Sequence, residues 1–138
     1  NDERMITLLT AENYEKDGPE FTETKKYLTE TKQKLEELKN TYVEFYTEEK
    51  VMSYINDKGL DEYYVDYYKN EIVGDIASVE EINIVESSID EVVAILEKTE
   101  EVIDLLIENN GAWQVENGNI VFESDSLSNQ YNELIAQL

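Results

Sequence analysis

The sequence predicts a mainly all-α protein: a long antiparallel helical hairpin or three-helix-type bundle, finished by a small C-terminal β-hairpin and a terminal helix. Two long stretches carry apolar residues seven positions apart, the spacing of helices that pack along one face. Near the end of the chain, an Asn-Gly pair separates two runs of β-forming residues, which is typical of a tight hairpin. One Pro and five Gly are too few for a many-turned β protein. We expect residues 1–138 to form a single helical-bundle domain, with the hairpin at residues 112–123.

The first segment, from Asp2 to Lys16, predicts a short amphipathic helix. Its apolar positions are Met5, Ile6, Leu8, Leu9 and Tyr14. The helix should end at Asp17, because Gly18 adopts the left-handed backbone after a helix without strain. Pro19 suits the first turn of the following helix.

The second segment, from Glu20 to Asp57, predicts a long helix. One apolar row is Phe21, Leu28, Leu35 and Tyr42, and its companion row is Leu38, Phe45 and Met52. Rows offset by three or four residues place one stripe on one face. Glu49 interrupts the first row, so we expect the packed seam to open or end there, and Lys58-Gly59 to end the helix.

The third segment, from Leu60 to Asn110, has the same period and predicts one helix or two. Its rows are Ile82, Ile89, Leu96 and Ile103, and Val85, Val92, Thr99 and Leu106. Ser88 and Glu91 have the spacing of a capping box, so a helix could begin there. The apolar spacing continues back beyond Ser88, which favours one long helix with a possible kink at Gly74 and an end at 109–111.

The C-terminal segment predicts a hairpin and a helix. Asn117-Gly118 supplies the two positive φ angles of a type I′ turn, and Trp113 and Val115 should share a face with Ile120 and Phe122 or lie diagonally to them. The terminal helix should be capped by Asp125 or Ser126, with these residues facing inward: Leu127, Tyr131, Leu134, Ile135 and Leu138. An alternative architecture is an elongated two-helix coiled coil with a small αβ end.

The charge excludes several classes of function. The chain has 33 acidic and 11 basic residues, a net charge of −22, and no His or Cys. Nucleic acid and anionic membranes would be repelled, so we expect neither as a partner, whereas a basic protein would be attracted. No apolar run approaches the roughly 20 residues that span a bilayer, so no transmembrane segment is expected. No phosphate loop, nucleophile elbow or cofactor fingerprint occurs, so we expect no cofactor, no catalytic residue and no enzyme.

Carboxylates are the remaining candidates for metal or acid–base chemistry. Residues 123–126 lack the central Gly and the ligand spacing of an EF-hand loop. Four acids of the third segment could hold Ca²⁺ or Mg²⁺ loosely: Glu97, Glu100, Glu101 and Asp104. They lie off the apolar rows, so a solvated acidic face is the simpler interpretation and we predict no metal site. A carboxylate-based hydrolase would need two acids facing each other in a cleft.

Tyrosines are the most distinctive local feature. Tyr63, Tyr64, Tyr67 and Tyr68 form two pairs four residues apart, and a single packed seam cannot bury them all. Tyr46 and Tyr54 would approach from the preceding helix if the two helices pack antiparallel across Gly59. Tyr is enriched at binding interfaces, so these six residues are the predicted partner-binding residues. The competing interpretation is a wide core stripe whose hydroxyls reach water.

Acidic charge lies beside these rings. Residues 61–109 contain 15 acids and only Lys69 and Lys98 as bases. The combination predicts a non-enzymatic extracytoplasmic module that recognises a protein partner with basic groups. In style the chain resembles the helical extracytoplasmic domains of Gram-positive surface lipoproteins, a broad class without a diagnostic motif, so no residue role follows from it. The alternative is an acidic immunity or inhibitor protein that neutralises a basic toxin or nuclease.

The location depends on how the chain starts. A start at Asn1 favours a processed export signal and an extracytoplasmic or cell-surface location. If Met5 is the native start, we expect a cytoplasmic protein.

Overall fold

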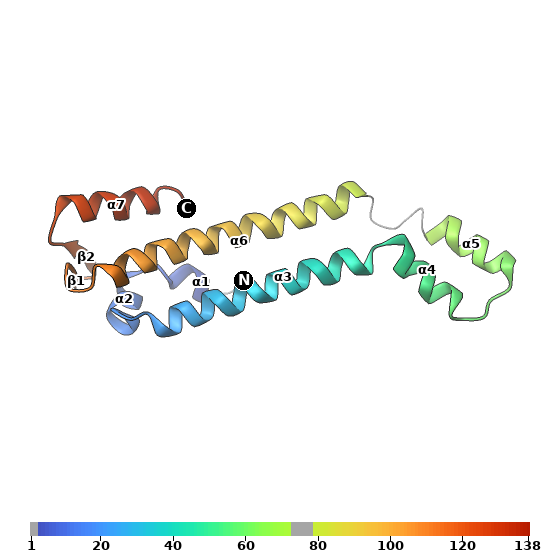
Figure 1. Ribbon diagram of the computed structural model, residues 1–138, viewed down its shortest axis with the longest axis horizontal. Coiled ribbons are helices and arrows are strands. Elements are labelled where there is room, and N and C mark those ends of the chain that lie inside the picture. The colour runs from blue at the N-terminus through green and yellow to red at the C-terminus, as the bar shows by residue number, and fades with distance from the viewer. Residues whose placement is uncertain (1–2, 73–78) are drawn as a thin grey trace. The chain divides into compact units, whose positions relative to one another are not determined.

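The computed structural model describes residues 3–72 and 79–138 (Figure 1). Its elements, in chain order, are α1 (Glu3–Thr7), α2 (Ala11–Asp17), α3 (Thr22–Phe45), α4 (Glu48–Asn56), α5 (Glu62–Ile72), α6 (Val79–Glu108), β1 (Trp113–Glu116), β2 (Asn119–Phe122) and α7 (Asp125–Ile135). The predicted fold class is confirmed: the protein is mainly helical, with a long helix pair and a small C-terminal sheet followed by a helix.

The chain forms two compact units. Unit 1 comprises Asn1–Lys32 and Val92–Leu138, and unit 2 comprises Gln33–Glu91. The helices α3 and α6 contribute to both units. The expectation of a single domain stays a prediction.

In unit 1, α3 and α6 run antiparallel and are joined by two ion pairs. Lys25 Nζ lies 2.6 Å from Asp104 Oδ1, and Lys32 Nζ lies 2.6 Å from Glu100 Oε2. As the residue number rises along α3, the number of its partner on α6 falls, so the two helices run in opposite directions (Figure 1). In unit 2, Lys39 of α3 pairs in the same way with Asp90 of α6, at 2.7 Å.

The N-terminal segment differs from its prediction. Instead of one helix from Asp2 to Lys16, it forms α1 and α2, separated by residues 8–10. Thr10 has extended backbone, and its Oγ1 accepts a hydrogen bond from the backbone N–H of Asn13 at 3.3 Å, so it begins α2 as an N-cap. The turn also lets Leu8 bury its side chain.

The predicted roles of Gly18 and Pro19 are both wrong. Gly18 has a φ of −74°, so it is extended, and the positive φ belongs to Phe21, at 50°. The α3 helix begins at Thr22, after the cis Gly18-Pro19 bond, so Pro19 precedes the helix. Gly18 is required for space instead: a Cβ there would collide with the carbonyl of Tyr14 and lie 2.9 Å from Cη2 of Trp113.

The predicted helix from Glu20 to Asp57 is divided. Helix α3 ends at Phe45, and α4 begins at Glu48 after an N-cap at Thr47, whose Oγ1 accepts from the N–H of Lys50 at 3.4 Å. The break, at residues 46–47, lies close to Glu49, the residue that interrupts the first apolar row. The end near Gly59 is confirmed, since Gly59 follows α4 with a φ of 61°.

The third segment contains two described helices, α5 and α6, and the proposed kink at Gly74 lies outside the described residues. The alternative start at Ser88 is wrong, because Ser88 lies within α6 and its hydroxyl donates to the Ile84 carbonyl at 2.8 Å. The predicted end is confirmed: α6 stops at Glu108, and Gly111 has a φ of 89°.

The core of unit 1 is formed by residues of α2, α6, β1, β2 and α7 and of the linkers on either side of α2. Its buried members are Tyr14, Phe21, Val102, Ile103, Leu106 and Tyr131. The hairpin packs against this cluster, and its register places Trp113 opposite Phe122 and Val115 opposite Ile120, so these four residues share one face and do not lie diagonally. Asn117 and Gly118 both have positive φ, which confirms the type I′ turn.

The terminal helix is confirmed with two corrections. Its N-cap is Ser124, whose Oγ accepts from the N–H of Leu127, rather than Asp125 or Ser126. Leu138 lies beyond the helix and is 44% exposed, so it does not face inward. None of the described helices is long and apolar enough to cross a membrane.

Candidate partner-binding surface

The four tyrosines of α5 form one broad exposed face. At 3.6 residues per turn, positions 63, 64, 67 and 68 span an arc of about 140° around the helix axis. Tyr63 is 71% exposed, and even Tyr68, the least accessible, is 38% exposed. The core-stripe interpretation is therefore wrong for these four residues. We call this set of tyrosines the α5 tyrosine face.

The rings of the α5 tyrosine face contact each other as sequence neighbours. The centroids of Tyr63 and Tyr64 lie 5.4 Å apart at 82°, and those of Tyr67 and Tyr68 lie 5.7 Å apart at 71°. Both pairs have the edge-to-face arrangement that aromatic rings prefer, and all four residues are exposed.

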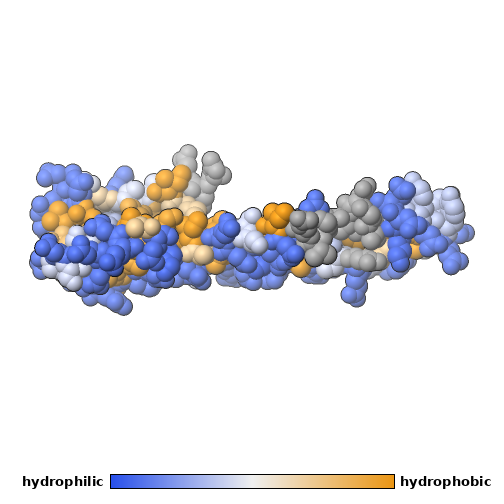
Figure 2. Space-filling view, turned by 90° about the horizontal axis from the view of Figure 1, so that it is seen from above, coloured by the Kyte–Doolittle hydropathy of each residue, from blue (hydrophilic) through white to orange (hydrophobic). Residues whose placement is uncertain are grey.

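Acidic side chains surround this face. Asp61, Glu62, Asp66 and Glu71 are exposed on or beside α5, and Lys69 is the only base between residues 61 and 72. The surface at the α5 end is coloured mostly hydrophilic in Figure 2. An apolar ring face beside carboxylates is suited to a guanidinium or ammonium group, which is attracted to both.

Tyr54 and Tyr46 do not belong to the α5 tyrosine face. Tyr54 is 52% exposed on α4, which contacts α5. Tyr46 follows α3, is half-buried, and packs on Tyr42 and Phe45 with centroid distances of 4.5 and 5.2 Å. No ring contact joins Tyr46 or Tyr54 to the α5 tyrosine face among the described residues. The structure thus brings four of the six predicted residues together on one helix.

The acids considered for metal binding are mostly paired with lysines. Glu100 and Asp104 bind Lys32 and Lys25 of α3, and Glu101 binds Lys98 one turn away at 2.7 Å. Within the described ranges, no group of three or more acids is placed to hold a metal ion. The hydrogen bond to Asp104 raises the pKa of Lys25, which keeps this lysine charged. The sequence reasoning missed this arrangement, although Lys25, Lys32 and Lys39 are seven residues apart.

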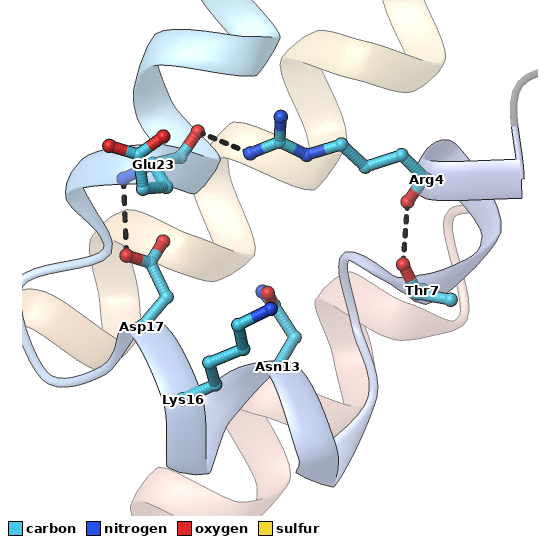
Figure 3. Close-up of a pocket in the computed structure, with 6 residues that line it drawn as sticks. All are labelled: Arg4, Thr7, Asn13, Lys16, Asp17 and Glu23. Carbon is cyan, nitrogen blue, oxygen red and sulfur yellow. Dashed lines mark hydrogen bonds between the residues drawn. The ribbon is translucent and has the colours of Figure 1, made fainter.

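An open depression of about 530 Å³ in unit 1 is the second candidate (Figure 3). It is lined by Arg4, Thr7, Asn13, Lys16, Asp17 and Glu23. Figure 3 shows that its polar groups bind each other: Arg4 Nη2 donates to the Glu23 carbonyl at 3.1 Å, and the Glu23 N–H donates to Asp17 Oδ1 at 3.1 Å.

Asp17 has a structural role in this depression. Its Oδ2 accepts a second bond, from the Thr24 N–H at 2.7 Å, so the carboxylate satisfies two free N–H groups in the first turn of α3. Desolvation acts to raise the pKa of Asp17, but the hydrogen bonds from Thr24 and Glu23, together with Arg4, lower it overall. The network fixes the start of α3, and we assign no ligand to this depression.

Two buried tyrosines form a pair that the sequence analysis does not identify. Tyr14 Oη and Tyr131 Oη lie 2.9 Å apart inside the core of unit 1, 117 residues apart in the chain. Each hydroxyl provides the hydrogen-bond partner of the other. We assign this hydrogen bond a role in stability.

No protein-family model, curated protein or solved structure matches the chain in the comparisons.

Proposed function

We propose that the protein is a non-enzymatic binding module that takes a basic segment of a protein partner on the α5 tyrosine face. The observation that carries the proposal is the exposure of four tyrosine rings, from 38% to 71%, on one helix beside four carboxylates. Rings in these positions add little to the stability of the protein, whereas they offer rigid apolar contact area to a partner.

Arginine is the group that this face fits best. A guanidinium stacks flat on a phenol ring and donates hydrogen bonds in its own plane, so it can contact a ring face and a neighbouring carboxylate together. The T-shaped pairs Tyr63–Tyr64 and Tyr67–Tyr68 present ring faces in more than one direction. The two pairs lie one helical turn apart, about 5–6 Å along the axis. Successive arginines of one segment could therefore each stack on a different tyrosine ring.

The alternative, an acidic inhibitor that mimics the charge of nucleic acid, draws on the acids of α6. In unit 1 the lysines of α3 and α6 pair with Glu100, Glu101 and Asp104, which reduces the unpaired charge on this helix. The α5 tyrosine face therefore supports the protein-binding proposal more directly than the charge of α6 supports mimicry.

The test uses a fluorescent hexa-arginine peptide titrated with the full chain. We expect changing Tyr63, Tyr64, Tyr67 and Tyr68 together to Ser to weaken binding at least tenfold. The matched control changes the same four residues to Phe, which keeps the ring faces and should keep most of the affinity. Hexa-lysine should bind more weakly than hexa-arginine, since ammonium groups do not stack. Equal affinity of the Ser variant and the unchanged protein would refute the proposal.

A further inference from the structure

The last two turns of α3 and the residue that follows them carry a separate apolar surface, formed by Leu38, Tyr42, Phe45 and Tyr46, which we call the α3 stripe. The first three residues follow the i, i+4, i+7 pattern of one helix face. Leu38 is 57% exposed and Phe45 is 53% exposed, although both belong to a row that the heptad pattern predicts to be packed. The rings of Tyr42 and Phe45 both contact Tyr46, so the stripe is continuous at its end.

The same row is covered where α3 passes through unit 1. Thr24 lies fourteen residues before Leu38, two heptads away, and is 1% exposed. Its Oγ1 accepts a hydrogen bond from Asn13 Nδ2 of α2 at 2.9 Å, so a helix lies against this side of α3. In unit 2, the row has the spacing of a packed helix face but remains open at Leu38 and Phe45.

Charge around the α3 stripe indicates what kind of partner could cover it. Residues 36–50 contain five glutamates and two lysines, a net charge of −3. Lys39 is bound to Asp90, and Lys50 is bound to Glu44 at 2.9 Å. Glu37 and Glu44 lie on the same side of α3, about 100–120° around the helix from Leu38. An occupant with lysine or arginine beside an apolar face would be attracted, whereas a second copy of this chain would bring the same glutamates and be repelled.

The backbone of α3 limits the shape of the occupant. Within a helix the N–H and C=O groups already bond to each other, so α3 offers no edge to an extended peptide. A helix satisfies its own backbone and can lay a row of side chains along the stripe. We infer that the α3 stripe binds an amphipathic helix of another protein, with its apolar face on Leu38 and Phe45 and a basic flank toward Glu37 and Glu44. This surface is distinct from the α5 tyrosine face.

A designed peptide tests the inference with the full chain. The probe has 21 residues, with Leu at the a and d positions of three heptads and Lys at e and g. We expect the double variant Leu38→Ser, Phe45→Ser to bind it at least tenfold more weakly than the unchanged protein, at physiological ionic strength. A version with Glu in place of Lys should not bind. Circular dichroism checks that the variant keeps its helix content, which two exposed side chains should not alter.

Two controls separate this inference from other causes. Ile84→Ser removes an apolar residue of unit 2 that is 58% exposed on α6, and it should leave the affinity unchanged. The variant with four serines on the α5 tyrosine face should also bind the designed peptide with unchanged affinity. The peptide result therefore does not depend on whether the proposed function is correct. Unchanged binding by the Leu38→Ser, Phe45→Ser variant would overturn the inference. So would a dimer, seen by sedimentation, that this variant abolishes, because a second copy would then be the occupant.

Discussion

Lys32 of α3 and Glu100 of α6 form the least exposed ion pair among the described residues of unit 1, with Nζ and Oε2 separated by 2.6 Å and about a quarter of each side chain accessible. Lys32 is the middle residue of a lysine row, Lys25, Lys32 and Lys39, in which each member binds an acid of α6. The row matches the antiparallel register of the two helices, because a shift of one helix would place these lysines opposite other side chains.

The pair should contribute a measurable coupling energy. We expect a double-mutant cycle with Lys32→Gln and Glu100→Gln to give about 0.5–1 kcal/mol of coupling in dilute buffer, since the pair is only partly screened by solvent. Added salt should reduce the coupling. Urea unfolding of the four proteins measures it. The exchanged variant Lys32→Glu, Glu100→Lys should recover most of the lost stability, and a coupling near zero would show that the register depends on apolar packing alone.

Gly18 provides a second prediction, because its role differs from that of Gly59. A Cβ at Gly18 would meet the Tyr14 carbonyl and Trp113, whereas nothing lies within 4 Å of a Cβ at Gly59, whose φ is 61°. Gly18→Ala should cost about 1–3 kcal/mol or more through overpacking, and Gly59→Ala about 1 kcal/mol through backbone strain. Gly59→Asn should recover part of its loss because Asn tolerates this conformation. Thermal unfolding of the three variants tests the ranking, and an unaffected Gly18→Ala protein would contradict the packing argument.

Asp17 supports a third prediction. Its carboxylate accepts from the N–H groups of Glu23 and Thr24, so Asp17→Ala should destabilise the protein by about 1 kcal/mol, the usual effect of losing a helix cap. Because the folded pKa of Asp17 is lowered, its contribution is present above the unfolded value near 4 and is lost as the pH falls through the folded pKa. The gap in stability between the two proteins should therefore narrow in acid. Glu20→Ala, at an exposed position in the same loop, is the control and should leave stability nearly unchanged.

The sequence predicts the elements that depend on local patterns. The heptad rows around Leu28 and Leu96 identify buried helix faces, and Asn117-Gly118 identifies the turn and the register of the hairpin. The exposed tyrosines follow from simple geometry, since one helix seam cannot bury four adjacent aromatic positions.

The errors arise where a distant contact decides the outcome. Gly18 is needed because Tyr14 and Trp113 leave no space for a Cβ beside it, and Trp113 is 95 positions away in the chain. Asp17 supplies a cap to a helix that begins five residues later, which no capping pattern describes. Leu38 and Phe45 have the spacing of core residues, and periodicity cannot tell whether a neighbouring helix is present to cover them.

The hydrogen bond between Tyr14 and Tyr131 predicts how the protein responds to alkali. Burial first, and then the neighbouring hydroxyl, raise the pKa of Tyr14, and burial raises the pKa of Tyr131 although the bond from Tyr14 lowers it in part. A raised folded pKa means that the folded protein holds the proton more tightly than the unfolded chain. The pair's contribution is therefore complete below the unfolded value, about pH 10, and is lost progressively above it.

We accordingly expect the melting temperature to fall steeply above about pH 10. In the double variant Tyr14→Phe, Tyr131→Phe, the fall should be smaller, because no buried phenol is left to ionise. At neutral pH that variant should remain close to the original in stability, since both partners of the bond are removed together. The single variant Tyr14→Phe should be the less stable of the two at neutral pH, because it leaves the Tyr131 hydroxyl without its partner. Thermal unfolding followed by circular dichroism between neutral pH and strong alkali measures all three proteins, and identical alkaline profiles would exclude the pair as the cause.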